Sequence, residues 1–415
     1  MDRNVILDPI HGYIDFDQMK SALFDTPQMQ RLRRIKQLGF SNLVYPGANH
    51  TRFEHSMGAM HLASLFLKIL RENKDSVSAV TDYDDLDEIV VAALLHDIGH
   101  GPFSHATEKL IEQYTRKSHD DVRHILTGTE VGDVLNDHGF APSRIAKHIA
   151  GETSVSQILS SEIDVDKMDY LARDMHYTGV ASGSIDYMRL LNHLEYFEDK
   201  LVLNAGAIRA AEGLLVSRYW MNVSVYYHHV SRISETMCSR ACAYLLENQI
   251  VHPQEFARLD DTSLMSVLRN DTGFAGEIAR RLDDRNLYKR ALYTGIESIG
   301  LNNIFAQRNR TARIEAEIAE NARVEPEAVI IDIPSKPAMA EMKALVMTAD
   351  GMKKLTDTSL FIKDLESVQV ANWKMGVFAP KEHLEAVSKA ANDFFEIGSK
   401  PKTKQFKFSD ILENE

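Results

Sequence analysis

A histidine and an aspartate stand side by side at the end of an apolar stretch of the sequence. Residues 89–95 (IVVAALL) are apolar at every position, which indicates a helix buried on all sides, and His96 and Asp97 follow directly. An imidazole and a carboxylate buried together without partners would cost several kcal/mol, and a bound cation removes that cost. The pair therefore predicts a metal site.

Two other segments offer further ligands. His55 lies in the first turn of a helix that opens at residues 52–56 (RFEHS), and residues 163–170 (IDVDKMDY) concentrate three aspartates among apolar residues. Spacing alone leaves the choice among these aspartates open. Two imidazoles and two carboxylates suit Fe, Mn, Zn, Co or Ni better than Mg. We expect one such divalent transition metal per subunit, within residues 52–170.

Two helical ladders of polar side chains are predicted beside these ligands. The first places residues at i, i+4 and i+8 on one helix face, with Lys167 beside it: Asp166, Tyr170 and Asp174. The second repeats this spacing within a long helix expected from about residue 207 to residue 246: Arg218, Asn222 and Tyr226. Either tyrosine alone would more often be a core aromatic. Together the ladders predict a wall that binds phosphates.

More histidines follow the metal pair closely: His100, His105 and His119. Glu108 stands three residues after His105, where its carboxylate can orient the imidazole and raise its pKa toward that of a general acid. A single histidine of this kind more often has a packing or surface role. Their clustering behind the metal pair favours proton transfer by His105.

Composition excludes several classes of protein. With 415 residues, of which 44% are hydrophobic and 26% charged, the chain can form a large core and a smaller appended domain. The formal net charge of -13 argues against a general nucleic-acid binder. Apolar stretches fall short of the ~20 residues of a membrane helix, and the N-terminus lacks a signal sequence. Cys238 and Cys242 fit a reducing compartment, so we expect a cytoplasmic protein.

Periodicity predicts a mainly α-helical fold. It is helical from about residue 17 to residue 292, with strand-like alternation only around residues 196–203. The pattern then changes to short strands and a closing helix, at 328–333, 344–348, 374–379 and 381–395. We expect a core over residues 1–325 and a small α+β region over residues 326–415. The lysines between residues 400 and 407 are expected to lie in a solvated terminus.

The sequence contains several ordered motifs: residues 8–12 (DPIHG), 25–28 (DTPQ), 31–33 (RLR), 35–39 (IKQLG), 46–48 (PGA), 52–56 (RFEHS), 96–105 (HDIGHGPFSH) and 164–167 (DVDK). These motifs resemble those of the HD-domain deoxynucleoside triphosphate (dNTP) triphosphohydrolases of animals and bacteria. The likeness runs from residue 5 to about residue 290 and becomes looser in the C-terminal region. It implies an HD-domain helical bundle followed by a small α+β appendage.

The resemblance also implies roles for individual residues. The metal ligands would be His55, His96, Asp97 and Asp166, which selects one aspartate of the three. A water activated by the metal would attack the α-phosphorus, and His105, grouped with His119 and Glu108, would protonate the departing 5′ oxygen. The products would be a deoxynucleoside and triphosphate. The substrate would be held by Gln37, Arg52, His100, Lys167, Tyr170, Asp174, Arg218, Asn222 and Tyr226, with Mg accompanying its phosphates.

Departures from the family pattern concern specificity and regulation. Glu108 and Asn222 stand where the animal enzyme carries an aspartate and a histidine, and the Tyr226 ring would exclude a ribose 2′-hydroxyl. A site for an activating guanine nucleotide, GTP or dGTP, is implied by Asp25, Gln30 and Arg33, but Asn4 and Leu7 replace polar and basic groups there. Activation is therefore a hypothesis, and the resemblance suggests a homotetramer.

Two alternatives to this function remain open. The first is another HD-class enzyme, namely a nucleotidase, a phosphodiesterase or a guanosine tetraphosphate hydrolase. The second is a nucleotide-binding regulator without turnover, which the complete set of metal ligands argues against. The sequence itself does not identify the preferred nucleotide or the metal.

Overall fold

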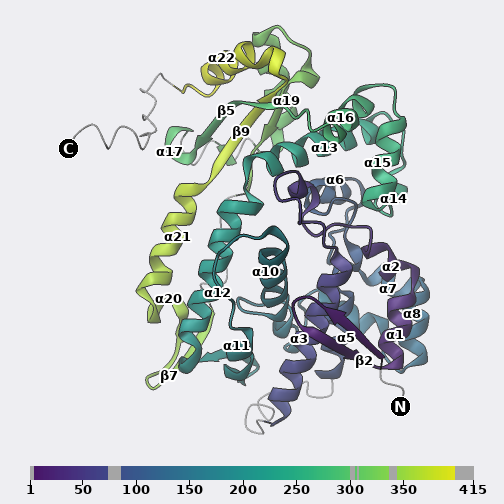
Figure 1. Ribbon diagram of the computed structural model, residues 1–415, viewed down its shortest axis with the longest axis vertical. Helices are drawn as coiled ribbons and strands as arrows, with labels where there is room; N and C mark the ends of the chain where they lie inside the picture. Colours follow the sequence, from purple (N-terminus) through teal and green to yellow (C-terminus); the bar gives the residue numbers. More distant parts are fainter. Residues whose placement is uncertain (1–3, 73–85, 300–303, 306–307, 336–343, 398–415) are drawn as a thin grey trace, which may run out of the picture. The chain divides into compact units, whose positions relative to one another are not determined.

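Residues 4–72, 86–299, 304–305, 308–335 and 344–397 are described by the computed structural model (Figure 1). The chain divides into two compact units: Met1–Leu287 with Pro337–Gln369, and Tyr288–Lys336 with Val370–Glu415. Helices dominate the described residues, which confirms the expected mainly α fold. The lysine run after residue 400 lies outside the described residues.

The first unit is built mostly of α-helices. They are α1 (Gln18–Asp25), α2 (Pro27–Leu32), α3 (Arg52–Glu72), α5 (Leu86–Leu95), α6 (His105–Thr115), α7 (Arg123–Gly128), α8 (Glu130–Asp137), α9 (Pro142–Ile149), α10 (Val165–Thr178), α11 (Tyr187–His193), α12 (Ile208–Met221), α13 (His229–Glu247), α14 (Pro253–Phe256), α15 (Asp261–Asn270), α16 (Phe274–Asp283) and α20 (Leu355–Thr358). The helix α21 (Leu360–Asn372) spans the division between the units. No helix of the described part is long and apolar enough to cross a membrane.

Helix α3 is the central element of this unit, because it packs against both α5 and α10. It begins at Arg52, where Glu54 accepts hydrogen bonds from the backbone nitrogen (2.5 Å) and the hydroxyl (3.0 Å) of Thr51. Residues 89–95 of α5 are all buried, as predicted, and the chain then tightens into the 3-10 helix η3 (His96–Gly99). The sequence therefore located both helices that carry the histidine ligands.

An N-terminal hairpin was missed by the sequence reasoning, which confined strands of the main body to residues 196–203. Strands β1 (Asn4–Asp8) and β2 (Gly12–Phe16) pair antiparallel around a tight turn. In this turn Asp8 Oδ1 accepts the backbone N–H groups of Ile10 and His11, both at 2.9 Å, and Gly12 takes a φ of 71°. Strand β1 alternates between partly buried and exposed residues, which is a period-2 pattern that the prediction did not use.

The long helix expected from residue 207 to residue 246 is interrupted. Helix α12 ends at Met221, a π-helical turn η6 (Asn222–Tyr226) follows, and α13 begins at His229. The backbone nitrogen of Tyr227 donates to the oxygen of Asn222 at 2.8 Å, which is the i to i+5 bond of a π-turn. The wider turn breaks the regular spacing that was predicted for Arg218, Asn222 and Tyr226.

Besides the hairpin, the described residues form two larger sheets. One contains β3 (Leu194–Phe197), β4 (Lys200–Asn204), β7 (Leu345–Thr348) and β8 (Gly351–Lys354) in that order, and confirms the strands expected near residues 196–203 and 344–348. The other, in the second unit, has the order β5 (Lys289–Gly295), β9 (Lys374–Ala379) and β6 (Ile330–Asp332). The helices of that unit are α17 (Ile296–Ile299), α19 (Thr311–Ala322) and α22 (Leu384–Phe394).

The compact units divide at other places than the boundary expected after residue 325. Strand β5 pairs with β9, which draws residues 288–325 into the second unit. Strand β7 pairs in parallel with β4, which returns residues 337–369 to the first unit. Strand pairing over long sequence distances therefore sets the division.

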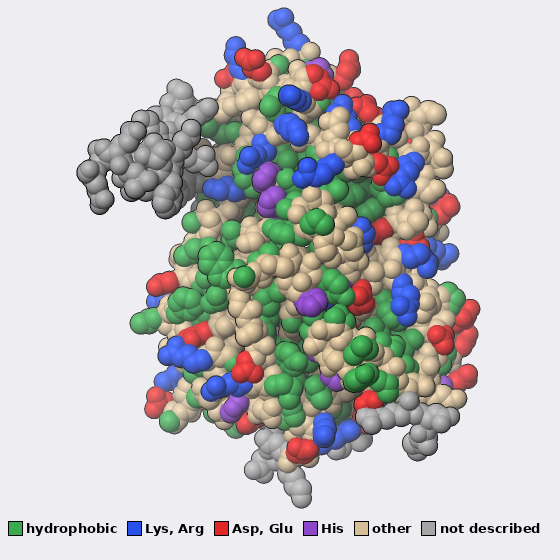
Figure 2. All heavy atoms as spheres, viewed as in Figure 1, with side chains coloured by type: hydrophobic (Ala, Val, Ile, Leu, Met, Phe, Trp, Pro, Cys, Tyr) green, Lys and Arg blue, Asp and Glu red, His purple; other side chains and the backbone are tan. Residues whose placement is uncertain are grey.

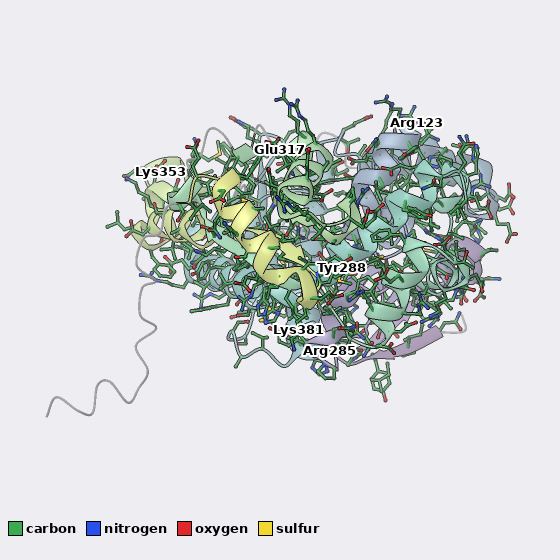
Figure 3. All side chains as sticks on the ribbon, turned by 90° about the horizontal axis from the view of Figure 1, so that it is seen from above. Arg123, Arg285, Tyr288, Glu317, Lys353 and Lys381 are labelled. Carbon is green, nitrogen blue, oxygen red and sulfur yellow. The ribbon has the colours of Figure 1, made fainter. Side chains whose placement is uncertain are left out.

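Charged side chains of both signs are interspersed on the face shown in Figure 2. Seen from above, Arg123 of α7 points away from the protein (Figure 3). Lys353 of β8 forms an ion pair with Asp350 at 2.8 Å.

Substituting one glycine of α3 tests the close packing of α3 on α10. A Cβ at Gly58 would clash with Asp169 Oδ1 and lie 2.5 Å from Arg173 Nη2, whereas a Cβ at the helical Gly213 of α12 would meet nothing within 4 Å. We expect Gly58→Ala to lower the free energy of unfolding by about 3 kcal/mol. Gly213→Ala should raise it by up to ~1 kcal/mol. Denaturant unfolding of both variants measures this, and equal stabilities would contradict the packing.

Candidate active site

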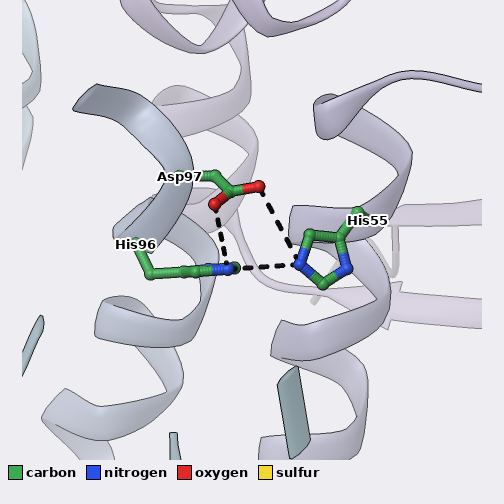
Figure 4. Close-up of side chains that lie close together, drawn as sticks. All are labelled: His55, His96 and Asp97. Carbon is green, nitrogen blue, oxygen red and sulfur yellow. Dashed lines mark hydrogen bonds and ion pairs between the residues drawn. The ribbon is translucent and has the colours of Figure 1, made fainter. Parts of the chain in front are cut away.

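Three of the predicted metal ligands form a tight cluster. The ligand atoms of His55, His96 and Asp97 all lie within 4.8 Å of one another, and the two histidine Nε2 atoms are 3.2 Å apart (Figure 4). Asp166 approaches from α10, with Oδ1 at 2.9 Å from His55 Nε2 and 3.6 Å from His96 Nε2. The structure thus brings together all four residues that were expected to bind the metal.

Hydrogen bonds outside the cluster fix the direction of both imidazoles. His55 Nδ1 lies 2.8 Å from Asp169 Oδ2, and His96 Nδ1 lies 2.8 Å from the backbone oxygen of Ala93. A nitrogen that donates to an oxygen leaves the other ring nitrogen with a free lone pair, which is how metal-binding histidines are commonly held. With both Nε2 atoms deprotonated, the two lone pairs would face each other and repel, and either a ring proton or a shared cation removes this repulsion. The donor set therefore fits a divalent transition metal.

The three aspartates of residues 163–170 have different surroundings. Asp164 caps α10: its Oδ1 accepts the backbone N–H of Lys167 at 2.8 Å, and its Oδ2 binds the Lys167 ammonium at 2.6 Å. Asp169 lies behind His55, on the side of Nδ1. Asp166 is the one of the three that approaches both Nε2 atoms. The lysine expected to hold phosphate is thus engaged with a cap aspartate and with the Ser161 oxygen at 3.0 Å.

Negative charge is in excess at the cluster. Burial alone would lower the pKa of His55, but hydrogen bonds to Asp166 and Asp169 raise it to about 10. Burial alone would raise the pKa of Asp97, but Arg52 and neighbouring histidines hold it well below its ordinary value. Arg52 donates to Asp97 Oδ2 and to Ser104 Oγ, both at 2.7 Å, and is itself buried. An environment that retains protons on imidazoles also favours a cation in their place.

A second group of histidines adjoins the cluster. Buried His100 lies 3.2 Å from Asp97 Oδ1, and its ring stacks on His119 with centroids 4.2 Å apart. Burial and the charge of Arg52 hold the pKa of His100 well below its ordinary value, so the ring is neutral and donates Nε2–H to Asp97. Glu108 bridges the two other histidines, with Oε2 3.0 Å from His105 Nδ1 and Oε1 paired with His119 Nδ1. The side chain of His105 is 68% exposed and thus open to a ligand.

Two tyrosines and an aspartate form a third group, close to the ligands. Tyr226 donates its hydroxyl to Asp174 Oδ2 at 2.7 Å, so the π-turn still brings this residue to α10. The Tyr170 ring centroid lies 6.3 Å from that of His55, and burial raises the pKa of Tyr170 to about 12, an effect that nearby Arg218 opposes. Arg218 opposes the rise of the pKa of Tyr226 in the same way.

The remaining predicted residues lie at the edges of these groups. Asn222 begins the π-turn and is partly buried. The backbone nitrogen of Gln37 donates to the His50 oxygen at 3.0 Å, and its buried Oε1 has no hydrogen-bond partner among the described residues. Around α1 and α2, Asp25 and Arg33 are exposed, and Arg33 Nε donates to Gln30 Oε1 at 3.1 Å.

Residues that orient the site were missed by the sequence reasoning. Asp169 accepts from His55 and from Arg173, and His50 Nε2 lies 2.7 Å from Asp174 Oδ1. His11 and Asp8 belong to a motif that had been noted without a role, the DPIHG run. No spacing rule connects residues 8–12 to α10, so only the motif itself could have drawn attention to them.

Removal of either ligand from the His96–Asp97 pair should abolish metal binding. Each variant, His96→Ala and Asp97→Ala, takes one of the facing ligand atoms from the cluster, and we expect at least a 100-fold loss of affinity for Mn²⁺ or Co²⁺. Elemental analysis of the purified proteins measures the occupancy, while circular dichroism checks that helix content is unchanged. The control is His124→Ala on exposed α7. Retention of metal by both ligand variants would refute the cluster as the metal site.

The protonation of His119 provides a test of the carboxylate bridge. Burial alone would lower the pKa of His119, but Asp120 and Glu108 raise it from 6.5 to about 10. A raised histidine pKa stabilises the fold below pH 6.5, and this contribution is lost as the pH rises toward 10. In Glu108→Gln we expect the pKa of His119 to fall toward 6.5, as followed by NMR of the imidazole protons. Glu112→Gln on the exposed side of α6 should leave it unchanged.

Comparison with known proteins places these features in a family. The HD domain pattern matches residues 52–174, and the HD associated region matches residues 185–406. An uncharacterised protein of Methanocaldococcus jannaschii is 34% identical over 92% of this chain and 80% of its own length. The deoxynucleoside triphosphate triphosphohydrolase SAMHD1 homolog of Dictyostelium discoideum is 31% identical, over 69% of this chain and 59% of its own length.

Solved structures agree with the sequence matches. A hypothetical protein from Aquifex aeolicus superposes with a TM-score of 0.75 at 27% identity, over 94% of this chain and 100% of its own. A phosphohydrolase from Bacteroides thetaiotaomicron gives a TM-score of 0.71 at 26% identity, over 92% of this chain and 100% of its own. The chain belongs to the HD-domain phosphohydrolase superfamily, as a member in which the HD domain is followed by the HD-associated region.

Proposed function

We propose that the protein is a dNTP triphosphohydrolase, which converts a dNTP and water to a deoxynucleoside and triphosphate. The observation that carries this proposal is the position of the Tyr170, Asp174 and Tyr226 group directly beside the metal ligand His55. A phenol paired with a carboxylate suits a sugar hydroxyl, which in a nucleotide lies next to the α-phosphate. The name of the Dictyostelium relative describes the same reaction.

Different residues of the chain would carry the separate steps of this reaction. When bound, a divalent metal supplies Lewis-acid chemistry at the four ligands. In the reaction a water oxygen forms a bond to the α-phosphorus and releases a proton to solvent, the bond from phosphorus to the 5′ oxygen breaks, and its electron pair remains on that oxygen. His105 then gives its proton to the 5′ oxygen, because Glu108 holds its Nδ1 and leaves Nε2 open to the ligand.

Arg52, Lys167 and Arg218 are the cations proposed to hold the phosphates. Arg52 and Lys167 are each paired with a carboxylate, so their donors are positioned before a ligand binds. Arg218 lies near both tyrosines of the sugar group. Gln37, His100 and Asn222 complete the proposed binding residues. The Tyr226 ring would fill the space of a ribose 2′-hydroxyl, which favours deoxynucleotides.

A guanine nucleotide is proposed as an activator, bound by Asp25, Gln30 and Arg33 in a homotetramer. Asp25 is exposed at the end of α1 and available to a ligand, while exposed Arg33 at the end of α2 is held by its bond to Gln30 and by its guanidinium lying 3.7 Å from the Phe53 ring centroid. Gln30 is partly engaged, since its amide donates to the Phe24 oxygen at 2.7 Å. Activation would require that this site and the catalytic site belong to one assembly.

Product analysis tests the proposed reaction. Metal-loaded protein is incubated with each dNTP and each NTP, with and without GTP or dGTP, and the products are separated by chromatography. We expect a deoxynucleoside and triphosphate, with dNTPs cleaved at least ~10-fold faster than NTPs. The His105→Ala variant serves as the control for background hydrolysis.

Other outcomes separate the alternatives. Release of a monophosphate or orthophosphate would exclude a triphosphohydrolase and favour another HD-class nucleotide phosphohydrolase. Turnover that is unaffected by guanine nucleotides would exclude the activating site. Nucleotide binding without any turnover would support a regulator.

A further inference from the structure

A buried polar chain lies behind His55, on the side that faces away from the metal cluster. Asp169 Oδ2 accepts from His55 Nδ1 at 2.8 Å, and its other oxygen, Oδ1, lies 2.6 Å from His11 Nε2. The side chains of His11 and Asp169 are both fully buried, at 0% exposure. The hairpin turn at the N-terminus is therefore one hydrogen-bonded residue away from a metal ligand.

Arg173, which lies one turn after Asp169 on α10, also holds the Asp169 carboxylate. Arg173 donates to both oxygens of Asp169 at 2.9 Å and to Asp8 Oδ2 at 2.7 Å. Within the described residues, Asp169 receives hydrogen bonds from His55, His11 and Arg173, and the hairpin contacts this group twice, through His11 to Asp169 and through Asp8 to Arg173. Gly58 of α3 leaves the space that the assembly occupies.

His11 is held there at an energetic cost. Its Nδ1 is buried and has no hydrogen-bond partner within the described part of the chain. The ring otherwise contacts aromatic neighbours, with centroids 5.3 Å from His61 and 5.4 Å from Tyr187. A buried nitrogen without a partner destabilises a fold by about 1–3 kcal/mol. What an apolar side chain at this position would lack is the hydrogen bond from Nε2 to Asp169.

We propose that His11 is a positioning residue for the metal site: by fixing the Asp169 carboxylate, it sets the ring orientation of His55 and thereby the affinity for the metal. Without the bond from His11, the carboxylate keeps its two bonds from Arg173 and the one from His55, and it can shift toward the space in which His11 Nε2 had held Oδ1. The His55 ring follows the carboxylate through Nδ1, and its Nε2 moves off the cluster. The inference rests on the cluster holding a metal and is independent of the substrate.

Two substitutions that differ by one methylene test this role. In His11→Gln the amide nitrogen reaches the place of Nε2 and can still donate to Asp169, while in His11→Asn it stops near the place of Nδ1. Both are polar and of similar size, so both proteins should fold. The exposed Tyr13→Leu in the same hairpin is the control. We expect Co²⁺ affinity near that of the wild type for Gln and for the control, and 10–100-fold weaker for Asn.

Two readouts besides activity decide the outcome. Co²⁺ titration against a chelator gives the affinity, and the visible spectrum of bound Co²⁺ reports the ligand geometry, which should change in His11→Asn only. Thermal unfolding of the metal-free proteins shows any purely structural effect. Equal affinities and spectra for Asn and Gln would overturn the proposal. Metal retained in His96→Ala would instead refute the metal cluster, so the two failures are distinguishable.

Discussion

Buried negative charge on α10 is the constraint on which the rest of the structure depends. Within three turns this helix carries Asp164, Asp166, Asp169 and Asp174, and three of them are almost fully buried. A buried carboxylate needs a counterpart, and the counterparts come partly from α10 itself and partly from other elements. Lys167 neutralises Asp164, Arg173 neutralises Asp169, and His50 with Tyr226 binds Asp174. Asp166 is directed at the Nε2 atoms of His55 and His96, where a bound cation can take the place of the ring protons, and this surplus of carboxylates makes the cluster a cation site.

Short-range patterns made much of this predictable. The apolar run before His96, the helix opening at Arg52 and the face shared by Asp166, Tyr170 and Asp174 depend on residues a few positions apart, and the structure has them as expected. Contacts between residues that lie far apart in the sequence could not be predicted from these patterns. His11 meets Asp169 across 158 positions, and β4 takes its parallel partner from the far end of the chain. The π-turn at Asn222 was missed for another reason: it keeps helical composition while adding one residue to a turn.

The cations proposed for the phosphates show how family likeness and geometry complement each other. The resemblance assigned Arg52 and Lys167 to the ligand, while the structure shows that both are already bound to carboxylates. These descriptions agree if the carboxylates serve to hold long, flexible side chains in one rotamer, which reduces the entropy lost when a phosphate is bound. Arg52 also links Asp97 to Ser104, so the same guanidinium spans the metal ligands and the turn that leads to His105.

The parallel pairing of β4 with β7 affects the order in which parts of the protein can fold during synthesis. About 140 residues separate the two strands, so one edge of β4 has no partner while the intervening chain is synthesised. At ~5–20 residues per second this interval lasts roughly 7–30 s on the ribosome. During that time an open strand edge is exposed to other chains, which is a hazard for aggregation. The helices around the metal ligands, all N-terminal to Thr178, can pack before that gap is closed.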